Sequence, residues 1–577
     1  MATFFSKPHS SFTYLNTTQF LGALNDNIFK LLIIYCFIHI EGIENSNSIL
    51  AVTGAIFVLP FLLFSASSGF LADRFSKSHI IIYTKVLEFV ALALGVLALQ
   101  YESKMAAYAV LFLMATLSAI FAPSKYGILP ELVATDKISN ANGLMTSFTF
   151  LAIILGTFLA SFLLDITDKH FVFVALFSTA MAFIAMVTSF CIQYTPPADK
   201  TKRFNILLFS EIYKTLKIAA EKPSLLMAIF GSAFFLFVAG YLQLNMIPFA
   251  VQTLHLTDLQ GGYLFLLSAL GIGSGAIFAG KISGKTAELG FVPMASIGMM
   301  LCCFLLDACS SHLWAVVPLV VVIGFFGGMY QVPLDSYIQI ASPHQSRGQI
   351  IAATNFLSFF GVLCSSGVLY LLSEILEVSP DKGFTVMGVL TLFVTGVIGY
   401  QYFDYLSRFI CMVLSKLHFQ TTLHGQEKVP ADTPVIYVCK HTAWNDTLLM
   451  LGSQRRRMRF FIERVHEHER KWIQMLYRLL RVIPLTPIES FENNVELLSA
   501  LKHALKKGIS VCIFVESSNL QEEIAKLKQS FISQDVFSDR VSPVIPVVIK
   551  KGEKPATAPW LQRVFKKFRV PAAISFG

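Results

Sequence analysis

The sequence has little charge for its length of 577 residues: Asp, Glu, Lys and Arg make up 14% of it, and 55% of the residues are hydrophobic. Soluble domains carry nearer to a quarter of charged residues, so most of this chain is expected to lie in lipid. No Gly-rich loop of the kind that cradles phosphate occurs. The nine cysteines are scattered, without a C-x-x-C pair or zinc spacing, so neither a metal site nor a disulfide framework is predicted.

Twelve apolar runs stand where the charge is missing, each near the roughly 20 residues that a membrane-spanning helix needs. The predicted spans are 15–40, 48–72, 79–99, 105–129, 143–164, 170–193, 225–250, 260–280, 290–309, 313–337, 348–373 and 383–403. The N-terminus lacks the layout of a cleaved signal peptide, so the first span is expected to be retained. Twelve spans place both ends of the chain on one side of the membrane.

Basic residues alternate between the loops and gather on that same side. The largest cluster lies between the sixth and seventh spans and comprises Lys200, Lys202, Arg203, Lys214, Lys217 and Lys222. Because positive loops stay in the cytoplasm, both termini and everything after the last span are predicted to be cytoplasmic.

The membrane part also repeats itself. "FAPSKYGILPELV" (121–133) is similar to "YQVPLDSYIQIAS" (330–342), so that Pro123 matches Pro333, 210 residues further on. We predict two six-helix halves, 1–193 and 225–403, joined by the linker 194–224, which is the layout of a duplicated transporter. The remaining residues, 404–577, are predicted to form a separate domain.

Residues 69–77, "GFLADRFSK", resemble the signature loop between the second and third helices of the major facilitator superfamily. The resemblance implies that Gly69 lets helices approach closely and that Asp73 and Arg74 pair across the cytoplasmic gate. The second half has "GKISGKTAELG" in the corresponding place, without the Asp-Arg pair. "QFLGALNDNIFK", "APSKYGILPEL" and "VPLDSYIQ" further resemble the bacterial lysophospholipid transporter branch, over residues 14–400. This implies a lysophospholipid substrate and the bacterial inner membrane.

Several charged residues fall inside the predicted spans. A charge near mid-membrane costs at least about 2.5–3.5 kcal/mol and is usually functional or paired. We expect Asp26, Lys30 and Lys125 to face a central cavity, where a carboxylate would take the ammonium of a zwitterionic head group and a lysine its phosphate. The alternative is internal ion pairs, Asp26 with Lys30 and Lys85 with Glu88, since each pair is near enough on one helix.

The pattern changes after Tyr405. The β-branched runs 435–439, 481–487, 509–517 and 542–550 read as strands, and 491–508 as an amphipathic helix that stops at a Gly. Alternating strands and helices over about 170 residues predict a compact cytoplasmic α/β domain. The segment 566–577 is expected to be a final edge strand.

His441 and Asp446 form an H-x-x-x-x-D pair directly after the first of these strands. Such a pair can take a proton from a hydroxyl, because the imidazole accepts it while the carboxylate holds its tautomer. "RFFIER", "IFVES" and "VIPV" follow in an order that resembles the four-motif glycerolipid acyltransferases of the lysophosphatidate acyltransferase type. The resemblance implies His441 as general base, Asp446 as its orienting group and Arg464 as phosphate ligand, with Glu516 and Ser517 in the third motif.

That third motif departs from the family pattern, Phe-Pro-Glu-Gly with an Arg soon after. Here it reads Phe514-Val515-Glu516-Ser517 and no Arg follows at once, so a backbone turn changes and a phosphate donor is missing. Two interpretations therefore stay open: a transporter fused to an active acyltransferase, or a lysolipid transporter whose tail domain is inactive and only docks on the membrane. A third is a lysophosphatidate acyltransferase held to the bilayer by the transporter-like part.

The first interpretation implies retrieval and repair of lysophospholipid, with lysophosphatidylethanolamine the expected substrate. It would be flipped inward and re-acylated at its free glycerol hydroxyl. No adenylate-forming domain follows, so the acyl group is expected to arrive as acyl carrier protein thioester or acyl-CoA, with no bound cofactor. "QRRRMRFF" (454–461) suits an anionic membrane surface, and nucleic acid is not an expected partner beside twelve spans.

Overall fold

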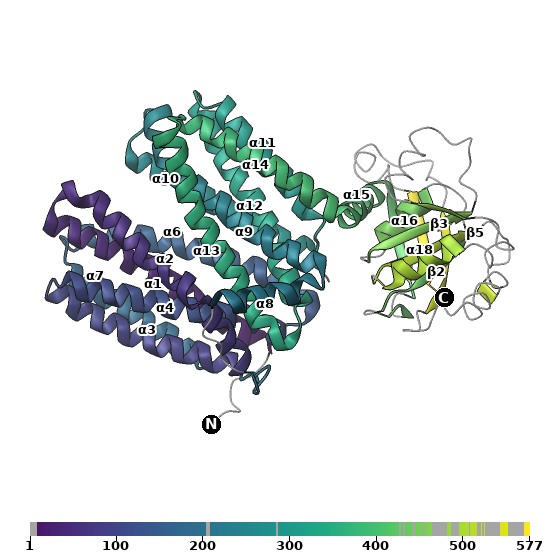
Figure 1. Ribbon diagram of the computed structural model, residues 1–577, viewed down its shortest axis with the longest axis horizontal. Coiled ribbons are helices and arrows are strands. Elements are labelled where there is room, and N and C mark those ends of the chain that lie inside the picture. The colour runs from purple at the N-terminus through teal and green to yellow at the C-terminus, as the bar shows by residue number, and fades with distance from the viewer. Residues whose placement is uncertain are drawn as a thin grey trace, which may run out of the picture. The chain divides into compact units, whose positions relative to one another are not determined.

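The chain divides into two compact units, Met1–Gln401 and Tyr402–Gly577, each described by itself below (Figure 1). In the computed structural model the described residues are 8–202, 208–283, 287–425, 428–430, 433–440, 445–453, 456–463, 482–485, 495–506, 508–515, 521, 524–525, 543–551 and 570–576. Within them, 12 helices are long and apolar enough to cross a membrane. The twelve expected spans are thereby confirmed, because length and hydropathy are the properties that select a spanning helix.

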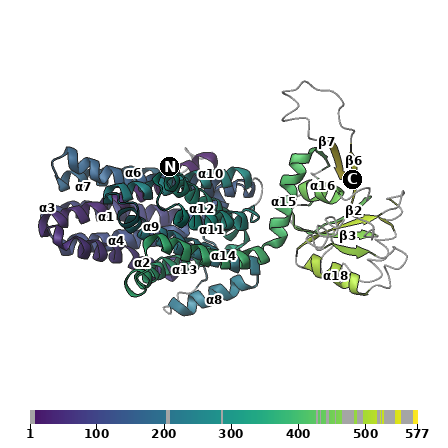
Figure 2. The same ribbon diagram turned by 90° about the horizontal axis from the view of Figure 1, so that it is seen from above.

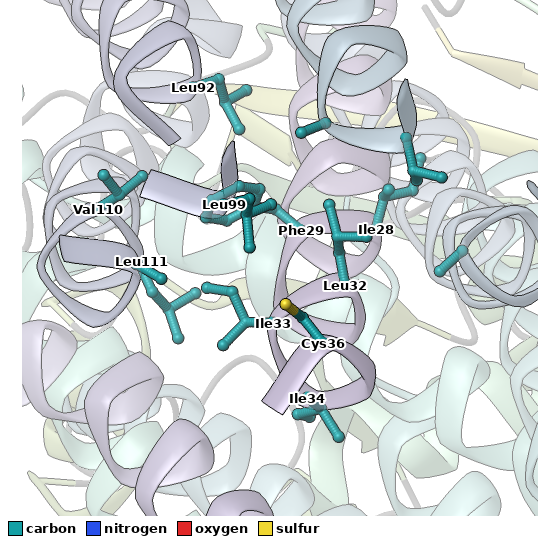
Figure 3. Packing of buried hydrophobic residues seen from close by; sticks show 14 of the residues in the cluster. Ile28, Phe29, Leu32, Ile33, Ile34, Cys36, Leu92, Leu99, Val110 and Leu111 are labelled. Carbon is teal, nitrogen blue, oxygen red and sulfur yellow. The ribbon is translucent and has the colours of Figure 1, made fainter. Parts of the chain in front are cut away.

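The first half of the first unit consists of α1 (Pro8–Glu41), α2 (Ser46–Arg74), α3 (Lys77–Gln100), α4 (Lys104–Gly127), α6 (Ile138–Ile166) and α7 (Phe171–Ser189), with the short α5 (Leu129–Leu132) between α4 and α6. Its core is apolar. Phe29 and Leu32 of α1 lie with Leu99 of α3 and Leu111 of α4 in one buried cluster (Figure 3). This packing buries one face of α1, so the charged side chains of this helix lie on its other face.

The second half repeats this arrangement with α9 (Pro223–Pro248), α10 (Asp258–Ser283), α11 (Phe291–Ala308), α12 (Leu313–Ala341), α13 (Arg347–Tyr370) and α14 (Pro380–Gln401). The linker between the halves carries an amphipathic helix, α8 (Leu208–Ala220), which lies beside α13 (Figures 1 and 2). Its buried Ile212 packs against Ala353 and Phe356 of α13. The linker is therefore attached to the second half by an apolar contact.

The halves meet at two helix crossings that depend on glycine. Gly69 of α2 lies against the first turn of α13, where an added Cβ would come within 2.9 Å of the Gln349 Cα. Gly280 of α10 lies in the same way against the first turn of α6, where an added Cβ would come within 2.8 Å of the Ser139 carbonyl oxygen. The spacing of 211 residues between Gly69 and Gly280 agrees with the sequence repeat.

The second unit begins with α15 (Phe403–His418) and contains one seven-stranded sheet of order β1-β7-β6-β2-β5-β3-β4. Its strands are β1 (Phe419–His424), β2 (Ile436–Lys440), β3 (Met458–Glu463), β4 (Ile483–Leu485), β5 (Ser510–Val515), β6 (Val544–Lys551) and β7 (Val570–Phe576). All pairs are parallel except β6 with β7. The expected α/β domain is confirmed.

Helices cover both faces of this sheet. Alternate residues of β2 face opposite ways, so Tyr437 and Cys439 share a core with α16 (Asn445–Ser453), whereas Ile436 and Val438 share one with α18 (Val495–Lys506). Figure 2 shows α16 and α18 on opposite sides of the strands. Residues of α15 also pack into the buried apolar layer under α16.

The expected last strand is present as β7, but its predicted place at the edge of the sheet is wrong. β7 lies inside the sheet, parallel to β1 on one side and antiparallel to β6 on the other. The physical reason is β1, "FQTTLH", whose polar residues gave no apolar strand signal in the sequence. Because β1 pairs with β7, β1 rather than β7 forms the edge of the sheet.

Candidate functional site

The charged face of α1 lies within the first half. Asp26 is half-buried, and its Oδ2 accepts a hydrogen bond from the Ser118 hydroxyl of α4 at 2.9 Å. Its Oδ1 is buried and accepts no hydrogen bond from the described residues. The Lys30 ammonium lies 5.2 Å from the centre of the Phe57 ring, and no ion pair within 4 Å joins it to Asp26 in the described part of the chain. Asp26 and Lys30 are thus not the internal pair that the sequence left open.

Lys125 and Lys85 lie near one aromatic ring and differ in their partners. The Lys125 ammonium is 5.7 Å from the Phe121 ring centre and 4.6 Å from that of Tyr126. Lys85 is 4.6 Å from the Phe121 ring but also pairs with Glu88 at 2.5 Å, with both side chains buried. Lys85 and Glu88 therefore form the internal ion pair, whereas Lys125 is held by aromatic faces and has no carboxylate within 4 Å among the described ion pairs.

A cavity of about 160 Å³ lies between the two halves. Tyr126 and Thr149 border it from the first half, and Ser232 and Asp335 from the second. Gln331 donates to Asp335 at 2.8 Å and to Ser232 at 2.7 Å, so the second-half wall is ordered by hydrogen bonds. Polar groups from both halves therefore face this cavity.

Asp73 and Arg74 lie where the linker crosses one end of the bundle, called the linker end below. The buried Asp73 carboxylate accepts hydrogen bonds from the backbone N–H groups of Gly348 (2.7 Å) and Gln349 (3.1 Å), at the start of α13, and from the Lys202 ammonium (2.7 Å). Arg74 donates to the Lys202 carbonyl oxygen at 2.6 Å. Asp73 thus reaches the other half, where its charge complements a helix N-terminus, while Arg74 holds the linker.

The sequence interpretation missed Lys202 as a functional residue. It counted this lysine only in the basic cluster that sets topology, although Lys202 also binds the Gln345 carbonyl oxygen at 2.9 Å. Ser118, the partner of Asp26, was missed as well. Neither carries a sequence signal, because each is defined by a partner far away along the chain.

In the second unit, Asp446 is fully buried in the first turn of α16. His441, Arg464, Glu516 and Ser517 lie outside the described residues. The strands that precede them are neighbours: β2 is parallel to β5 and β5 to β3, with Lys440 beside Val515 and Ile462 beside Phe514. Three motifs therefore follow strands that end at one common edge, the usual place for a site in a parallel sheet.

The layer beneath Asp446 contains two buried cysteines, Cys439 and Cys512. Burial, and then the neighbouring Cys439 and Asp446, raise the pKa of the Cys512 thiol well above its usual range. Burial likewise raises the pKa of Tyr437 to about 12. A protonated, buried thiol is a poor nucleophile, so Cys512 is expected to have a structural role in this layer.

Twelve spanning helices in two repeated halves, a cavity between the halves and a mostly parallel α/β domain after them in the chain define a membrane transporter joined to an enzyme-type domain. Residues 15–366 match the family model of the Major Facilitator Superfamily, and residues 420–550 match that of the acyltransferases. The chain belongs to the Major Facilitator Superfamily and carries an acyltransferase domain.

Two relatives of this chain carry the name of a lysophospholipid transporter. The "Lysophospholipid transporter LplT" of Photorhabdus laumondii is 27% identical over 326 residues, which cover 54% of this chain and 79% of that protein. The protein of the same name from Klebsiella pneumoniae subsp. pneumoniae is 27% identical over 372 residues, covering 63% of this chain and 88% of its own.

Solved structures show the same membrane fold at low identity. The human organic anion transporter MFSD10 (TETRAN) superposes with a TM-score of 0.56 at 15% identity, covering 68% of this chain and 100% of that one. The transporter FucP in the outward conformation gives a TM-score of 0.57 at 12% identity, covering 67% and 98%. The likeness establishes the fold of the first unit.

Proposed function

We propose that the first unit moves a lysophospholipid, with lysophosphatidylethanolamine the expected species, from one leaflet to the other, and that the second unit re-acylates it from an acyl thioester. The observation that carries the proposal is the set of Asp26, Lys30 and Lys125. Within the described chain these charges lie in spanning helices without an ion pair. Charges kept in a membrane without a partner mark a substrate path, and a head group with both signs of charge complements this set.

In this mechanism the head group enters between the halves while the acyl chain stays in lipid. Lys125 and Lys30 attract the phosphate, and Asp26 takes the ammonium. Rocking of the halves about the bound head group then exposes it to the other leaflet. The charges of Lys85 and Glu88 neutralise each other, so this ion pair has a structural role.

In the acyltransferase step, His441 takes the proton of the free glycerol hydroxyl while Asp446 holds the imidazole tautomer. The oxygen attacks the thioester carbonyl, a C–O bond forms and the C–S bond breaks. The leaving thiolate receives the proton from His441. The donor is acyl carrier protein thioester or acyl-CoA, and Arg464, Glu516 and Ser517 bind the substrate. Both termini are cytoplasmic and the membrane is the bacterial inner membrane.

Acyl transfer by the purified protein tests the enzyme part. Radiolabelled lysophosphatidylethanolamine is incubated in detergent with each thioester donor, comparing wild type with His441→Ala and with the exposed His503→Ala as matched control. Transfer lost only in His441→Ala supports the proposal. No transfer by wild type with either donor would favour the second candidate function, an inactive domain that docks on the membrane. The altered third motif supports this alternative.

Flipping in proteoliposomes tests the transport part. Asp26→Asn should lower the rate about 10-fold or more, because a charge-assisted hydrogen bond contributes roughly 1.5–3 kcal/mol. Asp165→Asn, the same change at an exposed aspartate of the same half, should leave the rate unchanged. Equal rates for wild type and Asp26→Asn would contradict the role of Asp26 in head-group binding.

A further inference from the structure

A cleft of about 710 Å³ lies in the first half at the end of the bundle opposite the linker end, called the far end below. Its floor is α1, which packs against both α6 and α7, whereas α6 and α7 have few contacts with each other. The Tyr35 hydroxyl of α1 lies 3.1 Å from the Ser161 hydroxyl of α6. The His39 ring of α1 lies 5.7 Å from the Phe171 ring of α7. All four residues line this cleft, called the α6–α7 cleft below.

Both signs of charge border the α6–α7 cleft. Asp168 and Lys169, in the turn between α6 and α7, line it, and both are exposed. Their φ angles are positive, 49° and 63°, a conformation that residues with a Cβ adopt at a cost. The turn is closed by the Lys169 N–H, which donates to the Leu164 carbonyl oxygen at 2.8 Å. The backbone of this turn therefore places a carboxylate and an ammonium side by side at the cleft.

These two charges differ from others at the far end in their lack of a partner. Lys104 pairs with Glu41 at 2.5 Å, and Lys382 of the second half pairs with a carboxylate at 2.9 Å. Within the described part of the chain, no ion pair within 4 Å includes Asp168 or Lys169. Both groups are therefore available to a ligand that carries both signs of charge.

The cleft lies at the depth of lipid head groups. The 29 residues of α6 measure about 43 Å at 1.5 Å per residue, and the hydrocarbon core is about 30 Å thick. The ends of α6 therefore extend beyond the hydrocarbon, and Ser161 lies near the boundary. Phe158, nearer the middle of α6, is 55% exposed and stacks 5.3 Å from Phe162. An acyl chain thus finds an apolar wall next to the polar cleft.

The α6–α7 cleft is separate from the transport face of α1. Tyr35 follows Asp26 by nine residues, which is two and a half turns at 3.6 residues per turn. The two side chains therefore leave opposite faces of α1. Because the cleft lies away from Asp26 and Lys30, its ligand comes from the surrounding bilayer and not from the transported lysolipid.

We propose that the α6–α7 cleft binds the head group of a bilayer phospholipid that carries a phosphate and a primary ammonium, as ethanolamine phospholipids do. Asp168 accepts hydrogen bonds from the ammonium, and Lys169 binds the phosphate. One proton of the Tyr35–Ser161 hydroxyl pair is used between the two groups, and the other can donate to the phosphate. A phospholipid without an ammonium leaves the Asp168 carboxylate uncompensated and binds more weakly. The bound lipid is a resident ligand between α6 and α7.

Lipid-dependent melting of the full chain in detergent tests the proposal. Delipidated wild type is compared with Asp168→Asn/Lys169→Gln. The matched control is Asp136→Asn/Lys137→Gln, the same two side chains in an exposed turn at the other end of α6. Each protein is titrated with dioleoylphosphatidylethanolamine, dioleoylphosphatidylglycerol or lysophosphatidylethanolamine. The rise in melting temperature gives an apparent Kd, because a ligand that binds only the folded state stabilises it.

The proposal expects dioleoylphosphatidylethanolamine to bind wild type and control alike and the Asp168→Asn/Lys169→Gln variant about 10-fold more weakly, since charge-assisted hydrogen bonds are lost. Equal affinity of this variant and wild type would overturn it. Equal affinity of wild type for the two dioleoyl lipids would overturn it as well, because the ammonium would then not matter. Tighter binding of the lysolipid than of the diacyl lipid would overturn the bilayer as the source.

A second measurement on wild type alone covers a variant that fails to fold. A photoreactive phosphatidylethanolamine is cross-linked to the full chain in vesicles, and the modified peptides are identified by mass. Cross-links within residues 158–173 that diminish when unlabelled phosphatidylethanolamine is added, and not when phosphatidylglycerol is added, are expected. Absence of cross-links from this segment would overturn the proposal.

Discussion

The two glycine crossings at the linker end have the same backbone contact and different polar chemistry. At the α2–α13 crossing, the Asp73 carboxylate joins Gly348, Gln349 and Lys202 in a charged clasp. At the α6–α10 crossing, the side chain of the N-cap residue Lys137 makes no capping hydrogen bond to α6. The offset between Gly69 and Gly280 matches Asp73 with Gly284, which has no side chain to form a clasp.

A neutral lock stands near the second crossing instead. Asn142 of α6 and Gln339 of α12 exchange two side-chain hydrogen bonds, at 3.0 Å and 2.9 Å, and both residues are buried. Duplication thus preserved the shape that glycine allows, while the polar groups diverged. Hydrogen bonds to charged groups are about twice as strong as neutral ones. Breaking the charged clasp should therefore require more free energy than breaking the neutral Asn142–Gln339 pair.

The largest effect is expected where the two crossings are alike. Gly69→Ala and Gly280→Ala should each lower stability by about 1–3 kcal/mol, because the new Cβ would meet backbone atoms of the other half. Gly54→Ala on α2 and Gly262→Ala on α10 are matched controls, since nothing lies within 4 Å of either position. Thermal unfolding in detergent measures the difference, and equal melting points within a pair would refute the close contact.

An effect of similar size separates the crossings. Asp73→Asn should weaken the closed linker end by roughly 1.5–3 kcal/mol, since bonds to a charged acceptor are lost. Spin labels at the exposed Asp136→Cys and Gln345→Cys, one in each half, report the opening as a longer distance between labels. A distance distribution unchanged by Asp73→Asn would show that the clasp does not hold the halves together.

The neutral lock should respond differently to single and double changes. Asn142→Leu leaves the buried Gln339 amide without its partner and should cost about 1–3 kcal/mol, whereas Asn142→Leu with Gln339→Leu should cost less. The same melting experiment measures both. A double variant less stable than either single variant would mean that the two amide hydrogen bonds contribute more free energy than burying their polar groups costs.

The smallest effect is expected from the linker. Lys202→Gln keeps both backbone hydrogen bonds to Asp73 and leaves an uncharged donor in place of the ammonium, so it should cost less than Asp73→Asn. The exposed Lys200→Gln, two residues earlier, is the control. The label distance described for Asp73→Asn should lengthen for Lys202→Gln alone, and by less than for Asp73→Asn.

The spans, the two halves and the α/β domain could be predicted because hydropathy, repeat and strand pattern are local signals. The clasp could not, since Gly348 lies 275 residues from Asp73 and is found only by folding the chain. β1 was missed because its side chains are mostly polar, and β7 was consequently placed at an edge.

The candidate sites show the same division. Asp26, Lys30 and Lys125 could be singled out as charges inside spans, whereas Ser118, Phe57 and the cavity beside Asp335 depend on packing between helices. Of the acyltransferase residues, Asp446 lies buried in the first turn of α16, and its role, like that of His441 outside the described residues, remains a prediction.

The position of β7 has a consequence for how the protein is made. β1 pairs with β7, whose first residue, Val570, is synthesised 151 residues after its partner Phe419. At about 5–20 residues per second, the ribosome needs roughly 8–30 s to cover that stretch. During this time β1 lacks its partner strand, and an unpaired strand edge is a template for aggregation. The transporter helices are complete before that interval begins, so translation separates the two units in time.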